Sequence, residues 1–253
     1  MKLFEIIFSP TGGTERAADI LAQALCTEIV KVDLTDPGFD PASLTISADD
    51  LCVLAAPSYG GRVPAVASAR IAKLSGNGAK IVLAAVYGNR EFEDTLIEMK
   101  DLAEAAGFTP VAAVAAIAEH SILRKFAAAR PDDADRDELT AFAAKISEAL
   151  KSGRTEPLSV PGNVPYKETK GSSMKPVADD SCIQCGLCAE KCPVCAIPAD
   201  HPEQTDPAVC FSCMRCVSVC PVGARSIAPE ALAMVDQFLT KVASERKSNQ
   251  LFL

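Results

Sequence analysis

Residues 182–193 read CIQCGLCAEKCP, and residues 210–221 read CFSCMRCVSVCP. Each segment spaces four cysteines as C-x2-C-x2-C-x3-C and follows the last one with proline. Every cysteine of the first run recurs 28 residues later in the second, so the region is an internal duplication. Eight of the 11 cysteines belong to these runs. Such clustering, in a chain whose first residues (MKLFEIIF) do not resemble a signal peptide, favours metal binding over a disulfide scaffold.

The duplicated spacing resembles that of bacterial two-cluster ferredoxins in every ligand position, over about residues 178–229. The resemblance implies two 4Fe–4S clusters, each held by three thiolates of one run and by the cysteine before proline of the other run. One set would be Cys182, Cys185, Cys188 and Cys220, and the other Cys210, Cys213, Cys216 and Cys192. Zinc knuckles are the alternative, but zinc prefers well-separated cysteine pairs. Cys26 and Cys52 are interpreted as packing residues, and Cys195 as packing or as a spare ligand.

The first 150 residues alternate strand-like and helix-like segments. Strands are expected at 3–8, 29–32, 50–56, 80–86 and 108–118, and helices at 14–25, 65–74, 92–106 and 136–150. This alternation predicts an α/β fold with a doubly wound parallel sheet. Four parts are expected: the α/β domain (1–150), a Pro/Gly-rich linker (151–177), the cysteine domain of small α+β type (178–229) and a terminal amphipathic helix (230–253).

The first predicted strand runs into Ser9-Pro10-Thr11-Gly12-Gly13-Thr14, which opens a helix. Hydroxyls, backbone N–H groups and a helix N-terminus together favour a bound phosphate. Neither G-K-[ST] nor G-x-G-x-x-G is present, so a monophosphate held by neutral donors is predicted. A simple helix cap is the alternative.

This loop resembles the FMN-phosphate loop of flavodoxins, S/T-x-T-G-x-T, at Ser9, Thr11, Gly12, Gly13 and Thr14, although flavodoxins usually have Asn where Gly13 stands. The resemblance implies FMN and a five-stranded sheet of order 2-1-3-4-5. Two later loops look like the flavin-ring loops of that family. They are Pro57-Ser58-Tyr59-Gly60-Gly61 and Tyr87-Gly88-Asn89, and both follow predicted strands. At such strand ends a doubly wound sheet binds ligands.

Composition sets limits on partners. The chain has 25 Lys and Arg against 33 Asp and Glu, a net charge of −8, so no basic nucleic-acid footprint is expected. An acidic surface suits redox partner proteins and plain solubility equally. The longest apolar runs, such as Ile81 to Tyr87, are too short for a membrane span, and a cytoplasmic protein is expected. Oligomeric state is not predicted.

The whole chain resembles a flavodoxin–ferredoxin fusion, known in anaerobic microbes. The resemblance implies an intracellular electron-transfer protein that relays electrons between two 4Fe–4S clusters and FMN, and on to a redox partner. A flavin-dependent reductase of a small acceptor such as a quinone is the alternative, and a redox sensor is a third. An electron carrier is favoured over a free-standing oxidoreductase because only His120 offers a candidate proton donor, and a surface position is the preferred interpretation of that histidine.

Overall fold

The computed structural model describes residues 2–153, 156–169, 171 and 174–253. Its main sheet has the strand order β2-β1-β3-β4-β5-β8, and all neighbours from β2 to β5 pair in parallel. The strands are β1 (Leu3–Ile7), β2 (Ile29–Asp33), β3 (Leu51–Pro57), β4 (Lys80–Tyr87), β5 (Thr109–Ile117) and β8 (Gln250–Phe252). The predicted α/β class and the order 2-1-3-4-5 are therefore confirmed.

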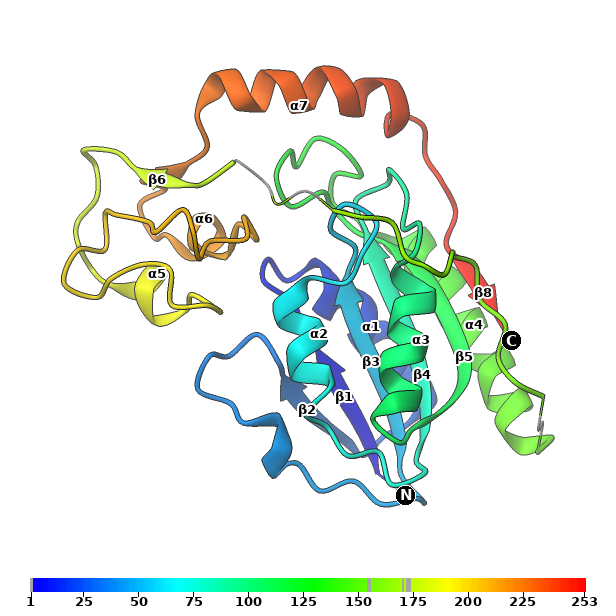
Figure 1. The fold of residues 1–253 in the computed structure, drawn as a ribbon. Coiled ribbons are helices and arrows are strands. Elements are labelled where there is room, and N and C mark those ends of the chain that lie inside the picture. The colour runs from blue at the N-terminus through cyan, green and yellow to red at the C-terminus, as the bar shows by residue number, and fades with distance from the viewer. Residues whose placement is uncertain (1, 154–155, 170, 172–173) are drawn as a thin grey trace.

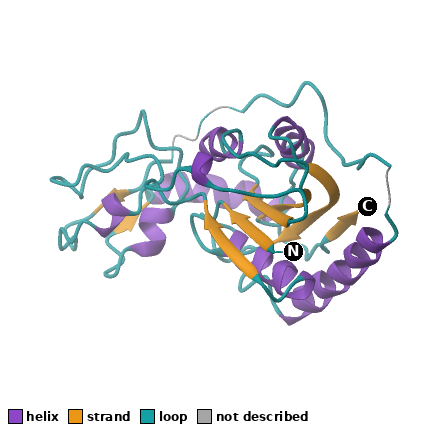
Figure 2. Cartoon of the chain, turned by 90° about the horizontal axis from the view of Figure 1, so that it is seen from below, coloured by secondary structure: helices purple, strands orange, loops and turns teal. Residues whose placement is uncertain are grey.

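Helices cover both faces of this sheet, as Figures 1 and 2 show. One face packs against α1 (Gly13–Leu25) and α4 (Asp133–Lys151), and the other against α2 (Ala65–Ile71) and α3 (Thr95–Ala105). A 3-10 turn, η1, spans Pro41–Ser43. The central strands are buried on both faces, which explains their continuous apolar sequences. The sheet thus separates two apolar cores.

A short antiparallel strand at the end of the chain was not predicted. In β8, Leu251 pairs with Val114 and Phe252 with Ala113, so a sixth strand covers the β5 edge. The sequence predicted a helix over residues 230–253, but the observed helix, α7 (Pro229–Val242), ends at Val242, so the prediction is wrong for residues 243–253. Figure 1 shows α7 running from the cysteine-rich part back towards β8. A three-residue strand has no periodicity of its own, so only its tertiary pairing defines it.

The cysteine-rich part is small and contains α5 (Leu187–Glu190), α6 (Arg215–Val219) and an antiparallel pair formed by β6 (Val177–Ala178) and β7 (Arg225–Ser226). Figure 1 shows it beside the α/β part.

The segment expected as a linker packs on the α/β part where it is described. Leu158 is buried in the core that α3 covers, and the backbone N–H groups of Asn163 and Lys167 donate to the Asp94 carboxylate at 2.8 and 2.7 Å. The Tyr166 hydroxyl donates to Asp101. These contacts place the 158–167 stretch along α3. No helix among the described residues has both the length and the apolar character to cross a bilayer.

Glu5 lies in the middle of β1 and is fully buried, and neither carboxylate oxygen has a hydrogen-bond partner in the described structure. Burial, with the nearby Asp19 charge, raises its pKa to about 7. Because the folded state holds this proton more tightly than the unfolded chain, stability falls as the pH rises from about 4.5 through 7. In Glu5→Gln we expect the free energy of unfolding to fall by about 2–3 kcal/mol less than in the wild type over this pH range.

The measurement is urea unfolding of both proteins at pH 5 and pH 8. Glu148→Gln, at an exposed position of α4, is the control and should keep the wild-type pH dependence. Equal pH dependence in Glu5→Gln and the wild type would contradict a raised Glu5 pKa.

Candidate functional site

The cysteines of the two runs gather around two small closed cavities. We call the first the first-run site, and it is lined by Cys182, Cys185, Cys188 and Cys220. We call the second the second-run site, and it is lined by Cys192, Cys210, Cys213 and Cys216. Each site therefore combines three cysteines of one run with the proline-preceding cysteine of the other run. This grouping is the one that the ferredoxin resemblance implies for the cluster ligands.

The backbone repeats together with the sequence. Gln184 and Ser212 occupy equivalent positions and have φ values of 53° and 63°, and Gly186 and Met214 have 75° and 64°. Left-handed conformations are uncommon outside glycine, so the same bend in both runs is a specific feature of this loop. In the second run the Ser212 N–H points to the Cys210 sulfur at 3.4 Å.

The donor set fits an iron–sulfur cluster. Among the described residues, no three His, Cys, Asp or Glu side chains converge as a single metal ion would require, whereas a four-iron cluster is held at its separate corners. Burial raises the pKa of Cys213 to about 12 and that of Cys216 to about 11, so these thiols need a metal's charge to ionise. At Cys220, N–H groups of residues 222–225 outweigh burial and lower the pKa. These sulfurs are placed to be metal thiolates.

The remaining cysteines differ from one another. Cys52 is fully buried in the core, as expected, and Cys26 is partly exposed at the end of α1. Cys195 is exposed and lines neither cysteine site, so the interpretation as packing is wrong. It has a φ of 53° where its repeat equivalent Gly223 has 69°, and this turn directs its side chain outward. Because Cys195 lies outside both cysteine sites, its position does not suit a spare cluster ligand either.

A larger cavity of about 930 Å³ lies at the carboxyl ends of β1, β3 and β4. It brings together all three loops that the sequence singled out. Of the predicted residues, those that line it are Thr11, Gly13, Thr14, Pro57, Ser58, Tyr59, Gly60, Tyr87 and Gly88. We call it the sheet-edge cavity. Ser9, Gly12, Gly61 and Asn89 do not line it.

The phosphate loop has distinct roles for its residues. The Ser9 hydroxyl accepts a hydrogen bond from the Glu15 N–H at 3.0 Å, so Ser9 acts as a local cap for α1. Thr11 and Thr14 face the sheet-edge cavity instead. A Cβ at Gly13 would stand 3.1 Å from that of Ala118, which explains why a larger residue is absent there. The N-terminus of α1 thus presents hydroxyls and amides to the cavity.

The loop after β3 folds into a tight turn. Tyr59 and Arg62 exchange backbone hydrogen bonds, and Gly60 and Gly61 between them have φ values of 63° and 85°. A side chain at Gly61 would collide with Glu93. Burial raises the pKa of Tyr59, whose phenol therefore stays protonated. The turn holds the Tyr59 ring at the cavity wall.

The loop after β4 uses its residues differently from the prediction. Tyr87 is almost fully buried and packs edge-on against Phe92, with ring centroids 5.4 Å apart, so it is a core residue at the cavity floor. The Asn89 side chain turns away and donates to the Ala243 and Glu245 carbonyls, both at 2.7 Å. Its amide therefore holds the C-terminal segment. Asn89 is not available to the cavity through its side chain.

His120 is half-buried and lines the sheet-edge cavity, so the interpretation as a surface residue is wrong. Its Nδ1 accepts the N–H groups of Ile122 at 3.2 Å and Leu123 at 3.1 Å. Burial, and then the Arg90 charge, lower its pKa to about 4. The imidazole is therefore neutral at pH 7, with its proton on Nε2.

Sequence reasoning missed three residues of the cysteine-rich part. Phe211 lines both the second-run site and the sheet-edge cavity. Arg215 lines the second-run site, and Arg225, which is almost fully buried, lines the first-run site. The sequence did contain a signal for Arg225: the equivalent position of the first repeat, 28 residues earlier, is the apolar Ile197, so a charged residue here departs from the repeat.

The comparisons with known proteins agree with this division of the chain. Residues 203–226 and residues 179–195 match two family models, Fer4 and Fer4_4, each described as "4Fe-4S binding domain". A stretch of 43 residues is 49% identical to the "Putative electron transport protein YccM" of Escherichia coli (strain K12). That stretch is 17% of this chain and only 12% of the relative.

Several solved flavodoxins are similar in structure. The Streptococcus pneumonia TIGR4 flavodoxin is 20% identical with a TM-score of 0.40, and the match covers 58% of this chain and 98% of that one. The Megasphaera elsdenii flavodoxin is 21% identical with a TM-score of 0.39, over 56% and 98% of the two chains. Flavodoxin 1 from Bacillus cereus is 16% identical with a TM-score of 0.40, over 58% and 98%.

The strand order observed here is itself the flavodoxin-like one. The chain thus joins a flavodoxin-like α/β part to a ferredoxin-like segment of the 4Fe–4S binding type.

Proposed function

We propose that this protein is an intracellular electron relay that holds two 4Fe–4S clusters at its two cysteine sites and FMN in the sheet-edge cavity, and that it passes electrons to a redox partner protein. One observation carries the proposal: Phe211 of the second cysteine run and Thr14 of the phosphate loop line the same cavity. The 4Fe–4S family matches support the cluster type, and the flavodoxin-like sheet supports a ligand at the strand ends. A cytoplasmic location belongs to this proposal.

The chain's own residues would divide the work as follows. Thr11, Thr14 and the first N–H groups of α1 would bind the FMN phosphate. Tyr59 would lie against the flavin ring, and the neutral His120 could donate a hydrogen bond from Nε2. Bound FMN would supply a site that exchanges one or two electrons, whereas each cluster exchanges one.

The flavin part is tested by Thr14→Val. A hydrogen bond to a charged group contributes about 1.5–3 kcal/mol, so we expect FMN affinity to fall about 10- to 150-fold with iron content unchanged. FMN, iron and sulfide are counted per chain after anaerobic purification, and FMN affinity is measured by fluorescence titration. Thr109→Val, at the exposed start of β5, is the matched control. Unchanged FMN affinity in Thr14→Val would remove this cavity as the flavin site.

The relay and the reductase are separated by steady-state assays. Reduction of protein acceptors only supports the relay, whereas sustained reduction of a quinone by the purified protein would favour the reductase. Clusters that break down reversibly in air would point to a redox sensor instead.

Arg225 should tune the potential of the clusters, because it lines the first-run site and its charge also acts on Cys216 of the second-run site. Its guanidinium donates to the Thr205 hydroxyl at 2.8 Å and to main-chain carbonyls, and its Nε is buried with no partner among the described residues. A nearby positive charge stabilises the more negative, reduced cluster. We expect Arg225→Ile, which copies Ile197 of the first repeat, to make one cluster potential more negative by about 60 mV, a tenfold change for one electron.

The measurement is an EPR-monitored redox titration, with Arg225→Lys as the charge-conserving control. Equal potentials in Arg225→Ile and Arg225→Lys, at full iron content, would show that the charge has no such effect.

A further inference from the structure

The cysteine-rich part contacts the α/β part through its second run. The Phe211 ring centroid lies 6.2 Å from that of Phe8 and 6.4 Å from that of Tyr59. The Tyr59 hydroxyl donates to the Cys213 carbonyl oxygen at 3.4 Å. Phe211 therefore fills the space between a core residue at the end of β1 and the tyrosine of the predicted flavin loop. Phe211, which lies in the same loop as Cys210 and Cys213, lines both the second-run site and the sheet-edge cavity.

Two arginines fix this arrangement with hydrogen bonds across the contact. Arg215, at the start of α6, donates to the Ser9 and Pro10 carbonyls of the phosphate loop at 3.2 and 3.3 Å. Arg70, on α2, donates to the Pro193 carbonyl at 2.7 Å. Both Arg215 and Pro193 line the second-run site. The polar contacts thus hold this site against the phosphate loop and against α2.

The first-run site lies away from this contact. None of its four cysteines is among the described residues that line the sheet-edge cavity, whereas Cys210 of the second-run site is. The wall of the first-run site includes Ile183, which is 61% exposed, and Val222, which is 45% exposed. Ile183 is the repeat equivalent of Phe211, so the same loop position faces solvent in one run and the cavity in the other.

From this asymmetry we propose an order of electron transfer that rests on the proposed function. The second-run site would hold the cluster that exchanges electrons with the flavin across Phe211 and Tyr59, and the first-run site would hold the cluster that exchanges them with external one-electron carriers. Each step would move a single electron between neighbouring sites, so that one site is oxidised as the next is reduced. Phe211 is the positioning residue that closes the distance between the second-run cluster and the cavity.

The test uses the full chain loaded anaerobically with iron, sulfide and FMN. Photogenerated methyl viologen radical supplies one electron, and visible absorbance follows its transfer from the clusters to the flavin. We expect Phe211→Ala to slow this internal phase several-fold, with FMN and iron content unchanged. Ile183→Ala, the matched change in the other run, should leave the internal rate as it is.

A second readout does not depend on rates. The EPR relaxation of one-electron-reduced flavin is enhanced by a nearby paramagnetic cluster, and this enhancement should persist in Cys185→Ser, in which the first-run site is damaged. If Phe211→Ala loses iron, sulfide or FMN, the kinetic test is made instead with Phe211→Leu that contains all three.

An unchanged internal rate in a fully loaded Phe211 variant, or loss of the enhancement in Cys185→Ser, would overturn the order. Wild-type protein that binds no FMN or no iron would instead refute the proposed function itself.

Discussion

Replacing Cys192 by serine is expected to damage the second-run cluster, although Cys192 belongs to the first run. The structure places this cysteine, almost fully buried, in the wall of the second-run site. Its sulfur accepts the Ala196 N–H at 3.3 Å. The hydroxyl of serine has a much higher pKa than the thiol of cysteine, so it ionises less readily. One iron of the second-run cluster would therefore lose its protein ligand. Because clusters are part of the folded state of such domains, we expect about half of the iron to be lost and the second-run half to loosen.

The measurement is iron and sulfide per chain, combined with EPR of the reduced protein. Cys220→Ser is the mirror-image variant and should damage the first-run cluster. Cys195→Ser, three residues from Cys192 but exposed and outside both sites, is the control and should keep all of the iron. Loss of signal confined to the first-run cluster in Cys192→Ser would contradict the crossed grouping.

The features that could be predicted from sequence are those set by local spacing. The duplicated spacing of the two cysteine runs is matched by a repeated loop conformation, including the left-handed Gln184 and Ser212, whereas the crossed grouping of the cysteines was implied by the ferredoxin resemblance. The buried strands β3 and β4 are readable because both of their faces are apolar. The three cavity loops follow strands of a parallel sheet, whose carboxyl ends meet at one edge. Topology alone therefore brings Thr14, Tyr59 and Gly88 to one cavity.

The features that sequence could not give depend on contacts between distant segments. Phe211 and Ile183 are equivalent in the repeat, and only the placement of the cysteine-rich part makes one of them buried against Tyr59. Asn89 belongs to a loop that looks like a flavin-ring loop in sequence, yet its side-chain amide binds carbonyls of the C-terminal segment. His120 has no local pattern that distinguishes a cavity wall from a surface. In each case the position of the side chain depends on tertiary packing against segments that are distant in the sequence.

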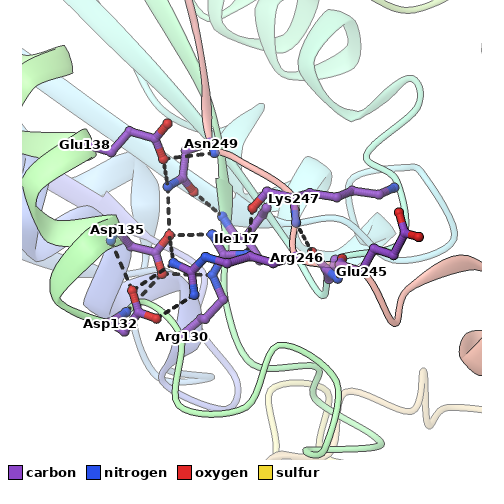
Figure 3. A network of polar contacts seen from close by, with 10 residues as sticks. Ile117, Arg130, Asp132, Asp135, Glu138, Glu245, Arg246, Lys247 and Asn249 are labelled. Carbon is purple, nitrogen blue, oxygen red and sulfur yellow. Dashed lines mark hydrogen bonds and ion pairs between the residues drawn. The ribbon is translucent and has the colours of Figure 1, made fainter.

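The C-terminal segment is held by a polar network that contains one buried ion pair (Figure 3). Arg130 and Asp135 are 3% and 1% exposed, and the Arg130 Nε donates to the Asp135 carboxylate at 2.8 Å. Asn249 donates to the same carboxylate at 2.9 Å and accepts the Ile117 N–H of β5 at 2.8 Å. Arg130 also donates to the Lys247 carbonyl at 2.9 Å. One carboxylate therefore joins α4, the loop before it and the residues that lead into β8.

Asp135→Ala is expected to produce the largest loss of stability in the α/β part. It leaves the Arg130 guanidinium buried without its partner, and breaking such a pair costs about 3–5 kcal/mol. Despite the opposing effect of burial, the Arg130 hydrogen bond lowers the pKa of Asp135, so its stabilising contribution is present at neutral pH and is lost as the pH falls below the usual carboxylate range. Urea unfolding at pH 7 measures the change.

The control is Arg246→Ala, whose half-exposed guanidinium pairs with Asp132 at 2.7 Å and lies 3.6 Å from the Asp135 carboxylate. Its removal leaves the buried Arg130–Asp135 pair in place and should cost no more than about 1 kcal/mol. Because α7 connects the ferredoxin-like segment to this network, Asp135→Ala should also speed hydrogen exchange over residues 229–253, whereas Arg246→Ala should change it little. Similar losses of stability in the two variants would mean that Asp135 is no more than another surface carboxylate. Faster exchange in Asp135→Ala alone would show that this buried pair keeps residues 229–253 packed against the α/β part.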